Sequence, residues 1–419
     1  MENLFEFENG LKLAYVENKA VRSIALGVYV GVGSINENAG NNGVSHFIEH
    51  MTFKGTKSRT AFDIVNEIDS IGAKINAFTS KNNTCYYTVS LDKNIEKCAE
   101  ILSDLYFNST FPEDELERER RVILEEISES EDTPDDVCME RLSETFFKGH
   151  ALSRSILGTK KSLLSLSRED LFSYKAKSYT ADNTVVVLTG NITFDNAKAI
   201  AEKYFVKKFD GAKCGLIEIP PAKYHSNLTK KTKKIEQSHI AFAFPSVKYE
   251  DDRDLAVQLL CTVFGLEMSS RLFQKVREQL GLCYTIYAYP SFYKKEGSLI
   301  IYTSTNPASI EKAVKAIKSE IELLLENGIT DDELKKGKEQ MKTGLVLGQE
   351  STTAIMRAYG RNVLFAGKLY DIDEKIAKID KLNAEDILSV AREIFDFSKV
   401  SSSYVGTKSD IDILKLMKE

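Results

Sequence analysis

The sequence lacks the features that mark several common classes of protein. No apolar run is long enough to span a membrane, and the N-terminal residues have neither a basic segment nor an apolar segment of a signal peptide. The six cysteines show no paired spacing, which argues against disulfides and cysteine-bound zinc. A net charge of −6 disfavours nucleic acid as a partner. We therefore expect a globular cytoplasmic protein that binds neither membranes nor nucleic acid.

Histidine is scarce, yet two of the five histidines lie four residues apart, at His46 and His50. Residues with this spacing share one face of a helix, so both imidazoles can bind one metal ion. Glu49 lies on the same turn, close enough to act on a water molecule held by that metal. The order H-x-x-E-H is the inverzincin signature. The segment therefore predicts a zinc peptidase in which Glu49 is the general base.

A third protein ligand would still leave one zinc position open for water. Candidates lie in segment 117–127, where Glu119 and Glu126 are seven residues apart and share a helix face. Glu125 points about 100° away from Glu126. The apolar residues that mark the buried side of this helix are Val122, Ile123 and Ile127. We expect one of the two carboxylates on the shared face to bind the metal and the other to accept a histidine N–H.

Segments of the first half recur in the same order in the second half. Matched segments begin at residues 95 and 310, 112 and 330, and 168 and 384, and a fourth pair ends at Gly190 and Gly406. The offsets are 310 − 95 = 215, 330 − 112 = 218, 384 − 168 = 216 and 406 − 190 = 216. Four near-equal offsets indicate two copies of one structural unit.

This repetition predicts an α+β fold with two homologous domains, each an antiparallel sheet with helices packed mainly on one face. We expect a catalytic zinc-binding domain over residues 1–212, a linker over 213–230 and the second domain over 231–419. Gly337 and Gly344 lie 218 residues after Glu119 and Glu126. Because the second copy lacks the candidate ligands, we expect the metal site in the first domain alone.

The segment from His46 to Thr56, HFIEHMTFKGT, resembles the active-site segment of the pitrilysin/insulinase family, which includes the mitochondrial processing peptidases. The resemblance extends to residues 31–34 before this segment and to residues 132–136 after it. It implies that Glu126 is the third zinc ligand, that Glu119 supports a histidine, and that each chain binds one Zn²⁺. Mn²⁺ or Co²⁺ would also suit two histidines and a carboxylate.

The resemblance also implies how a peptide is bound. Residues 72–79 read as a turn followed by a strand, and in the family this strand is an exposed edge to which the substrate adds as a further strand. Asn76, Ala77 and Phe78 match the substrate-contacting positions. The alternative interpretation is an ordinary strand with Asn76 in a bulge.

In the second half, Arg277 and Tyr284 match an Arg…Leu-Gly-x-x-Tyr segment of the family. The resemblance implies that they contact the peptide carbonyl and its developing oxyanion. The alternative is a surface arginine and a half-buried strand tyrosine. In the family this pair comes from the half-shell of a clamshell chamber opposite the zinc, which implies a homodimer with Arg277 and Tyr284 acting in trans. A catalytic subunit of a heterodimeric processing peptidase and a non-catalytic peptide-binding scaffold are the alternatives.

Overall fold

The chain folds into two compact units in the computed structural model, which describes residues 2–209 and 211–419. The first unit contains the chain up to Ile127 together with Arg154–Ile219 and Leu347–Tyr370, and the second contains Ser128–Ser153, Pro220–Val346 and Asp371–Glu419. The units therefore exchange one segment each, whereas the sequence suggested contiguous boundaries. Met1 and Asp210, which the expected first domain includes, fall outside the described residues.

The first unit is built on a six-stranded sheet with the order β1-β2-β6-β3-β5-β4. The β2–β6 pair is parallel and the other pairs are antiparallel. The strands are β1 (Glu2–Glu6), β2 (Lys12–Glu17), β3 (Ser23–Val30), β4 (Lys74–Thr79), β5 (Thr84–Leu91) and β6 (Thr184–Gly190). One face packs on most of the helices of this unit and forms its larger core. These helices are α1 (Val44–Thr52), α2 (Ala61–Ser70), α3 (Ile95–Asn108), α4 (Glu113–Asp132), α6 (Lys160–Ser165), α7 (Arg168–Ser178) and α8 (Phe194–Tyr204).

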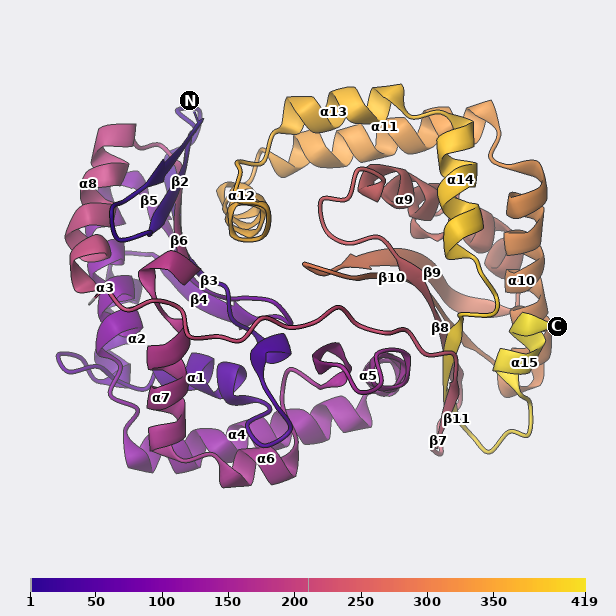
Figure 1. Ribbon diagram of the computed structural model, residues 1–419, viewed down its shortest axis with the longest axis horizontal. Coiled ribbons are helices and arrows are strands. Elements are labelled where there is room, and N and C mark those ends of the chain that lie inside the picture. The colour runs from indigo at the N-terminus through magenta and orange to yellow at the C-terminus, as the bar shows by residue number, and fades with distance from the viewer. Residues whose placement is uncertain (1, 210) are drawn as a thin grey trace. The chain divides into compact units, whose positions relative to one another are not determined.

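The opposite face of this sheet is covered by α12 (Thr352–Ala366), which Figure 1 shows nearly end-on, on the side away from α3 and α8. Strand residues alternate between the two faces, so Leu13 packs with the larger core while Ala14 packs with α12. Gly360 allows the helix to approach closely, because a Cβ there would lie 2.4 Å from a ring carbon of Tyr29. Apolar residues thus cover both faces of the first sheet.

The second unit repeats this plan with the strand order β7-β11-β8-β10-β9 and one parallel pair, β7–β11. Its strands are β7 (Leu228–Thr232), β8 (Ser238–Ser246), β9 (Cys283–Phe292), β10 (Gly297–Thr305) and β11 (Ser401–Gly406). Its helices are α9 (Asp254–Cys261), α10 (Ile310–Asn327), α11 (Asp331–Gly348), α13 (Ile372–Lys381), α14 (Ala384–Ile394) and α15 (Ile413–Lys418), with π-helical turns at Thr262–Leu266 and Phe273–Gln279. The helix α5 (Pro134–Phe146) packs on β8 and β11, where Cys138 Sγ donates to Ser403 O at 3.7 Å.

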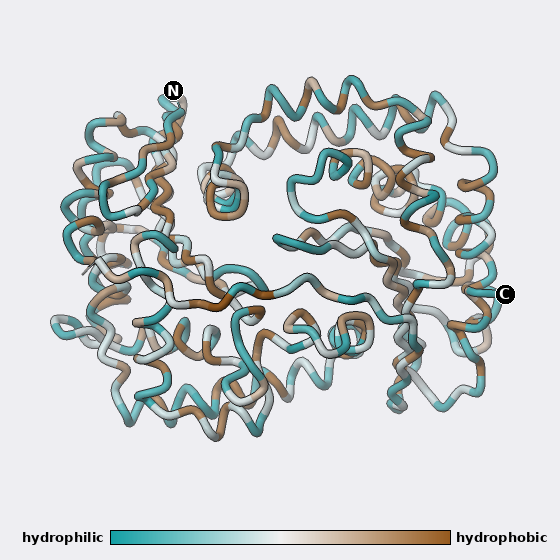
Figure 2. Tube along the Cα trace, viewed as in Figure 1, coloured by the Kyte–Doolittle hydropathy of each residue, from teal (hydrophilic) through white to brown (hydrophobic). Residues whose placement is uncertain are grey.

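Apart from β1, the two sheets have the same strand order, which confirms the α+β fold class and the internal duplication. Equivalent helices also begin with the same capping box. At the start of α7, the Ser167 side chain accepts from Asp170 N and the Asp170 carboxylate accepts from Ser167 N. At the start of α14, Asn383 and Asp386 form the same pair of bonds. In Figure 2, hydrophobic residues recur along the strands of both sheets, and the outer helices alternate between hydrophobic and hydrophilic positions. None of the described helices combines the length and apolarity needed to cross a membrane.

Candidate metal centre

Helices α1 and α4 bring three potential metal ligands together in the first unit. The rings of His46 and His50 lie one turn apart on α1, with centroids 4.5 Å from each other. The carboxylate of Glu126 on α4 lies 3.8 Å from His46 Nε2 and 3.6 Å from His50 Nε2. One ligand atom from each residue falls within 4.8 Å of the other two. Two imidazoles and a carboxylate at this spacing fit a zinc ion with bonds of about 2.0–2.2 Å.

Glu119 lies behind this group and contacts His50 from the side opposite Glu126. Its Oε2 is 3.0 Å from His50 Nδ1, and its Oε1 is 2.8 Å from Lys54 Nζ. An Nδ1–H donated to this carboxylate leaves the His50 Nε2 lone pair directed at Glu126 and available to a metal. Lys54 neutralises the buried carboxylate, a role that the sequence did not reveal although Lys54 belongs to the segment with the family resemblance.

The face of α4 that supplies these carboxylates is narrower than the sequence suggested. Glu119 and Ile123 are buried and Glu126 is half-buried, whereas Glu125 is exposed. Val122, expected on the buried side, is 42% exposed, so that expectation was wrong. The buried residues of α4, which also include Leu116 and Arg120, recur at intervals of three or four positions along one side of the helix.

A carboxylate at the start of α1 fixes the helix that carries the histidines. Glu37 is almost fully buried, and its Oε2 accepts hydrogen bonds from Gly43 N at 2.7 Å and Asn42 Nδ2 at 2.8 Å. Its Oε1 accepts from Ser45 N at 2.9 Å. These bonds satisfy N–H groups that a helix start leaves unpaired, and the negative charge suits the positive end of the helix dipole. An acidic residue shortly before the helix is the only sign of this role in the sequence.

Glu49 lies beside the three ligands, and its environment suits a proton acceptor. Burial raises the pKa of Glu49, while a hydrogen bond from Thr79 Oγ1 to its Oε2 opposes the shift. Burial, assisted by neighbouring His50, lowers the pKa of His46 to about 3. His46 is therefore neutral near pH 7, which is the form that binds metal. Thr79 was not singled out from the sequence, because only the fold brings β4 next to α1.

The expected substrate strand is β4, at one edge of the first sheet. Within the described chain it pairs with β5 alone, and the register is unbroken from Lys74 to Thr79. The alternative of a bulge at Asn76 is therefore not seen. Asn76, Ala77 and Phe78 all lie on this strand, and Asn76 Oδ1 accepts from Ala77 N at 2.8 Å. An open edge of this kind can accept a further strand.

Arg277 and Tyr284 lie together in the second unit. The Arg277 guanidinium is 4.8 Å from the centroid of the Tyr284 ring and 4.5 Å from that of Phe273. Tyr284 is 72% exposed, which differs from the half-buried tyrosine of the alternative interpretation. The structure therefore pairs these two residues on the surface of their own unit, separate in the chain from the metal-binding group.

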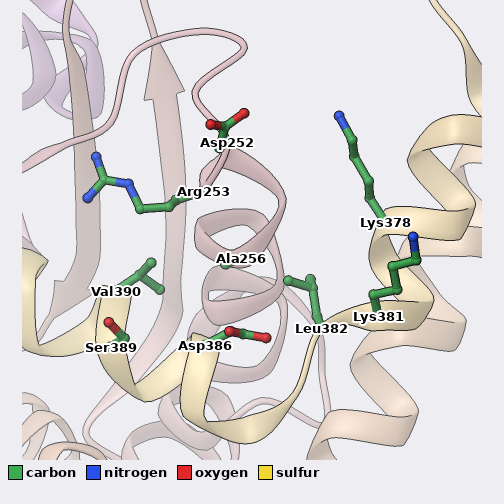
Figure 3. Close-up of a pocket in the computed structure, with 9 residues that line it drawn as sticks. All are labelled: Asp252, Arg253, Ala256, Lys378, Lys381, Leu382, Asp386, Ser389 and Val390. Atoms are coloured by element: carbon green, nitrogen blue, oxygen red, sulfur yellow. The ribbon is translucent and has the colours of Figure 1, made fainter.

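The second unit also contains a hollow of about 230 Å³ between α9, α13 and α14 (Figure 3). Two of its cationic groups already have partners: Arg253 pairs with Asp251 at 2.9 Å, and Lys378 pairs with Glu374 at 2.7 Å. Neither histidine nor cysteine is among the described residues that line it. We see no catalytic chemistry in this hollow.

Comparison with known proteins agrees with the site geometry. A Bacillus subtilis (strain 168) protein named "Uncharacterized zinc protease YmxG" is 39% identical over 93% of this chain and 94% of its own length. An "Uncharacterized zinc protease" of Rickettsia felis is 36% identical over 96% of this chain and 97% of its own length. Residues 12–160 match the model of the family described as "Insulinase (Peptidase family M16)". The chain belongs to peptidase family M16. The resemblance noted in the sequence is thereby confirmed.

The rest of the chain and its fold agree with this M16 membership. Residues 165–341 match the model described as "Peptidase M16 inactive domain", in keeping with a second copy that lacks the ligand residues. A crystal structure of a peptidase M16 inactive domain from Pseudomonas fluorescens has a TM-score of 0.91 at 20% identity, over 98% of this chain and 99% of that one. A protease from Helicobacter pylori has a TM-score of 0.90 at 20% identity, over 97% and 99%. These structures share the M16 fold with this chain.

Proposed function

We propose that this M16 protein is a zinc-dependent endopeptidase that cleaves short or unfolded peptides bound as an added strand along β4. The observation that carries the proposal is the convergence of His46, His50 and Glu126, whose ligand atoms lie within 4.8 Å of one another beside Glu49. The names of the relatives, which call them zinc proteases, support Zn²⁺ as the metal. The single group of three ligand residues found in the described part of the chain supports one ion per chain.

A zinc ion held by these ligands would polarise the scissile carbonyl and make a nearby water molecule more acidic. Glu49 accepts the proton of that water and passes it to the leaving amine. Thr79 binds Oε2 of Glu49, so Oε1 is the atom free to carry the proton. Glu119 holds Nδ1–H of His50 and keeps the ring in the tautomer that presents Nε2.

The edge strand supports a preference for extended peptides with little demand on their sequence. Backbone hydrogen bonds to an added strand do not depend on side chains, but the peptide must be unfolded enough to lie straight.

The six cysteines are unpaired, which fits the reducing cytoplasm as the place of action.

We further propose that two copies form a dimer in which Arg277 and Tyr284 of the partner subunit complete each site. The chain carries the metal-binding group and this pair in separate compact units, and Tyr284 is largely exposed. A guanidinium and a phenol there could donate hydrogen bonds to the substrate carbonyl as it becomes an oxyanion.

The test of the chemistry compares the wild type with Glu49→Gln on a quenched unstructured peptide, with metal content assayed on both. The wild type should cut, a chelator should stop it, and the variant should hold zinc with turnover lowered roughly 10²–10⁴-fold. Undiminished turnover by the variant would contradict the mechanism. A wild type that holds zinc but cuts nothing would favour the heterodimeric processing peptidase. Peptide binding without metal would favour the scaffold.

The test of the assembly mixes two inactive chains. Arg277→Ala chains mixed with Glu49→Gln chains should regain cleavage, because one of the two composite sites in each mixed dimer contains every residue. Tyr284→Phe chains, which should lose less activity, can replace the Arg277→Ala chains in the same mixture. Failure to recover in mixtures shown to exchange subunits would exclude action in trans, and a monomeric mass would exclude the homodimer.

A further inference from the structure

The edge strand β4 presents a different environment on each face. Ile75 and Ala77 pack towards the core that contains α1, and Thr79 on the same side binds Glu49. Phe78 instead packs with the residues covered by α12. Because residues paired across neighbouring strands share a face, a peptide added to β4 would also place alternate side chains towards Glu49 and towards α12.

On the α12 side, the charged side chain of Arg357 lies beside the edge strand. Its side chain is exposed, and its guanidinium lies 5.4 Å from the ring centroid of Phe78 and 5.6 Å from that of Tyr87. Its Nη2 donates a hydrogen bond to Tyr87 Oη at 3.2 Å. Tyr87 stands opposite Asn76 in the β4–β5 pair, so both rings belong to the strands at the edge. Two aromatic contacts and one hydrogen bond hold this side chain beside the strand that would receive the peptide.

The guanidinium retains donors for another group. Arginine carries five N–H donors, and the only hydrogen bond found for Arg357 within the described chain is the one to Tyr87. No carboxylate of the described residues forms an ion pair with it. A planar guanidinium with unused N–H donors matches the two oxygens of a carboxylate.

We infer that Arg357 is a specificity-determining residue that favours peptides with an aspartate or glutamate at the position beside Phe78. This inference rests on the proposed function, because it assumes that a peptide occupies the β4 edge. In the bound peptide, the residue beside Phe78 is adjacent to the residue beside Thr79, and Thr79 donates a hydrogen bond to Glu49. The acidic residue therefore lies within about two residues of the bond that is cut.

The experiment uses a set of unstructured peptides that differ only by Glu, Gln or Lys at one position at a time around the cleavage site. For the wild type, kcat/KM should favour Glu over Lys by about fivefold at a single position, as expected for a partly screened charge pair. Arg357→Gln should remove this preference, and Arg357→Glu should reverse it at the same position. Arg361→Glu makes the same charge change four residues further along α12 and is the matched control.

A reversal confined to one position, seen with Arg357→Glu but not with Arg361→Glu, would support the inference. Equal losses at every position, or an unchanged profile, would overturn it, since a purely structural role cannot exchange one preference for another. If Arg357→Glu does not fold, the flat profile expected of Arg357→Gln carries the same test.

Binding of the labelled peptides to zinc-loaded Glu49→Gln chains, followed by fluorescence anisotropy, separates this inference from the proposed function. A preference for Glu in binding, without cleavage by the wild type, would refute the peptidase and keep the role of Arg357. Binding without preference, or no binding, would refute that role.

Discussion

Helices α4 and α11 occupy equivalent places in the two units, and their side chains are used in opposite ways. Each begins with three acidic residues after the equivalent helices α3 and α10. In α4, the buried carboxylate of Glu119 reaches His50 and Lys54. In α11, the corresponding Gly337 is buried, and a Cβ there would lie 2.6 Å from Leu259 and 2.9 Å from Val263. The same scaffold position supports a metal-binding group in one unit and close helix packing in the other.

The second position on these helices shows the same contrast. Glu126 provides a ligand atom, whereas a Cβ at the corresponding Gly344 would meet no described atom within 4 Å. A buried carboxylate without a cation or hydrogen-bond donors destabilises the folded chain. A copy without the histidines is therefore more stable without the carboxylates as well. The scaffold therefore tolerates either glutamate or glycine at these positions, and the surrounding residues decide which of them is stable.

Among substitutions at these equivalent positions, Glu119→Ala should change zinc binding the most. Removal of the carboxylate leaves His50 Nδ1 without its acceptor, so zinc affinity should fall about 10–100-fold. Competition with a chromophoric chelator measures the change. Glu125→Ala, an exposed neighbour of Glu126 on α4, is the control and should leave the affinity unaltered. Equal affinities for both variants would mean that Glu119 does not orient His50.

The metal-free first unit should lose stability as the pH falls from about 6.5 to about 3. The pKa of His46 is lowered to about 3 by burial, so in this window the unfolded chain binds a proton that the folded chain does not. From pH 7 to pH 5 the cost is about 1–2 kcal/mol of the free energy of unfolding. Denaturant titrations of metal-free wild type and His46→Gln should show a smaller loss for the variant. Identical losses would contradict the proton linkage.

Gly337→Glu tests the close packing around α11, because it introduces the glutamate that α4 has at the equivalent position. The new side chain would meet Leu259 and Val263 and find no histidine beside it, so the second unit should lose about 1–3 kcal/mol of stability. Thermal unfolding measures this loss. Gly337→Ala should already be destabilising, because the Cβ itself is too close, and a neutral result would contradict the packing argument.

The smallest expected effect comes from Gly344→Glu. Since the site is open, the substitution should stabilise α11 by about 0.5–1 kcal/mol through helix propensity alone. It should create no metal site, because the second copy has no counterparts of His46 and His50. Binding of more than one zinc ion per chain by this variant would contradict this expectation, because the second unit would then bind zinc without the histidines.

Much of this architecture could be predicted from local sequence. Offsets of 215 to 218 residues revealed the duplication, and the spacing of His46, Glu49 and His50 indicated a metal-binding helix. Glu119 and Glu126 were identifiable as partners of that helix because they share one face of α4. Hydrophobic periodicity overstated the buried face, as the exposure of Val122 shows, since periodicity does not report how wide a contact is.

The exchange of segments between the units was not predictable from the sequence. The helix α5 directly follows α4 in the chain, yet it packs on β8 and β11 of the second sheet. The helix α12 of the second half packs on β3 and β6 of the first sheet in return. A hydrophobic pattern along a helix does not specify which of two similar sheets the helix covers, so the exchange depends on complementary surfaces that form only in the folded chain.

Spacing along the chain was enough to show which residues can bind zinc, on which helices they lie and that one structural unit occurs twice. Other contacts became evident only in the folded chain: Lys54 neutralises Glu119, Thr79 holds Glu49, Glu37 anchors α1 and Arg357 lies beside the β4 edge. Most of these contacts join residues that are distant in sequence, so they exist only once the packing of strands and helices has fixed their positions.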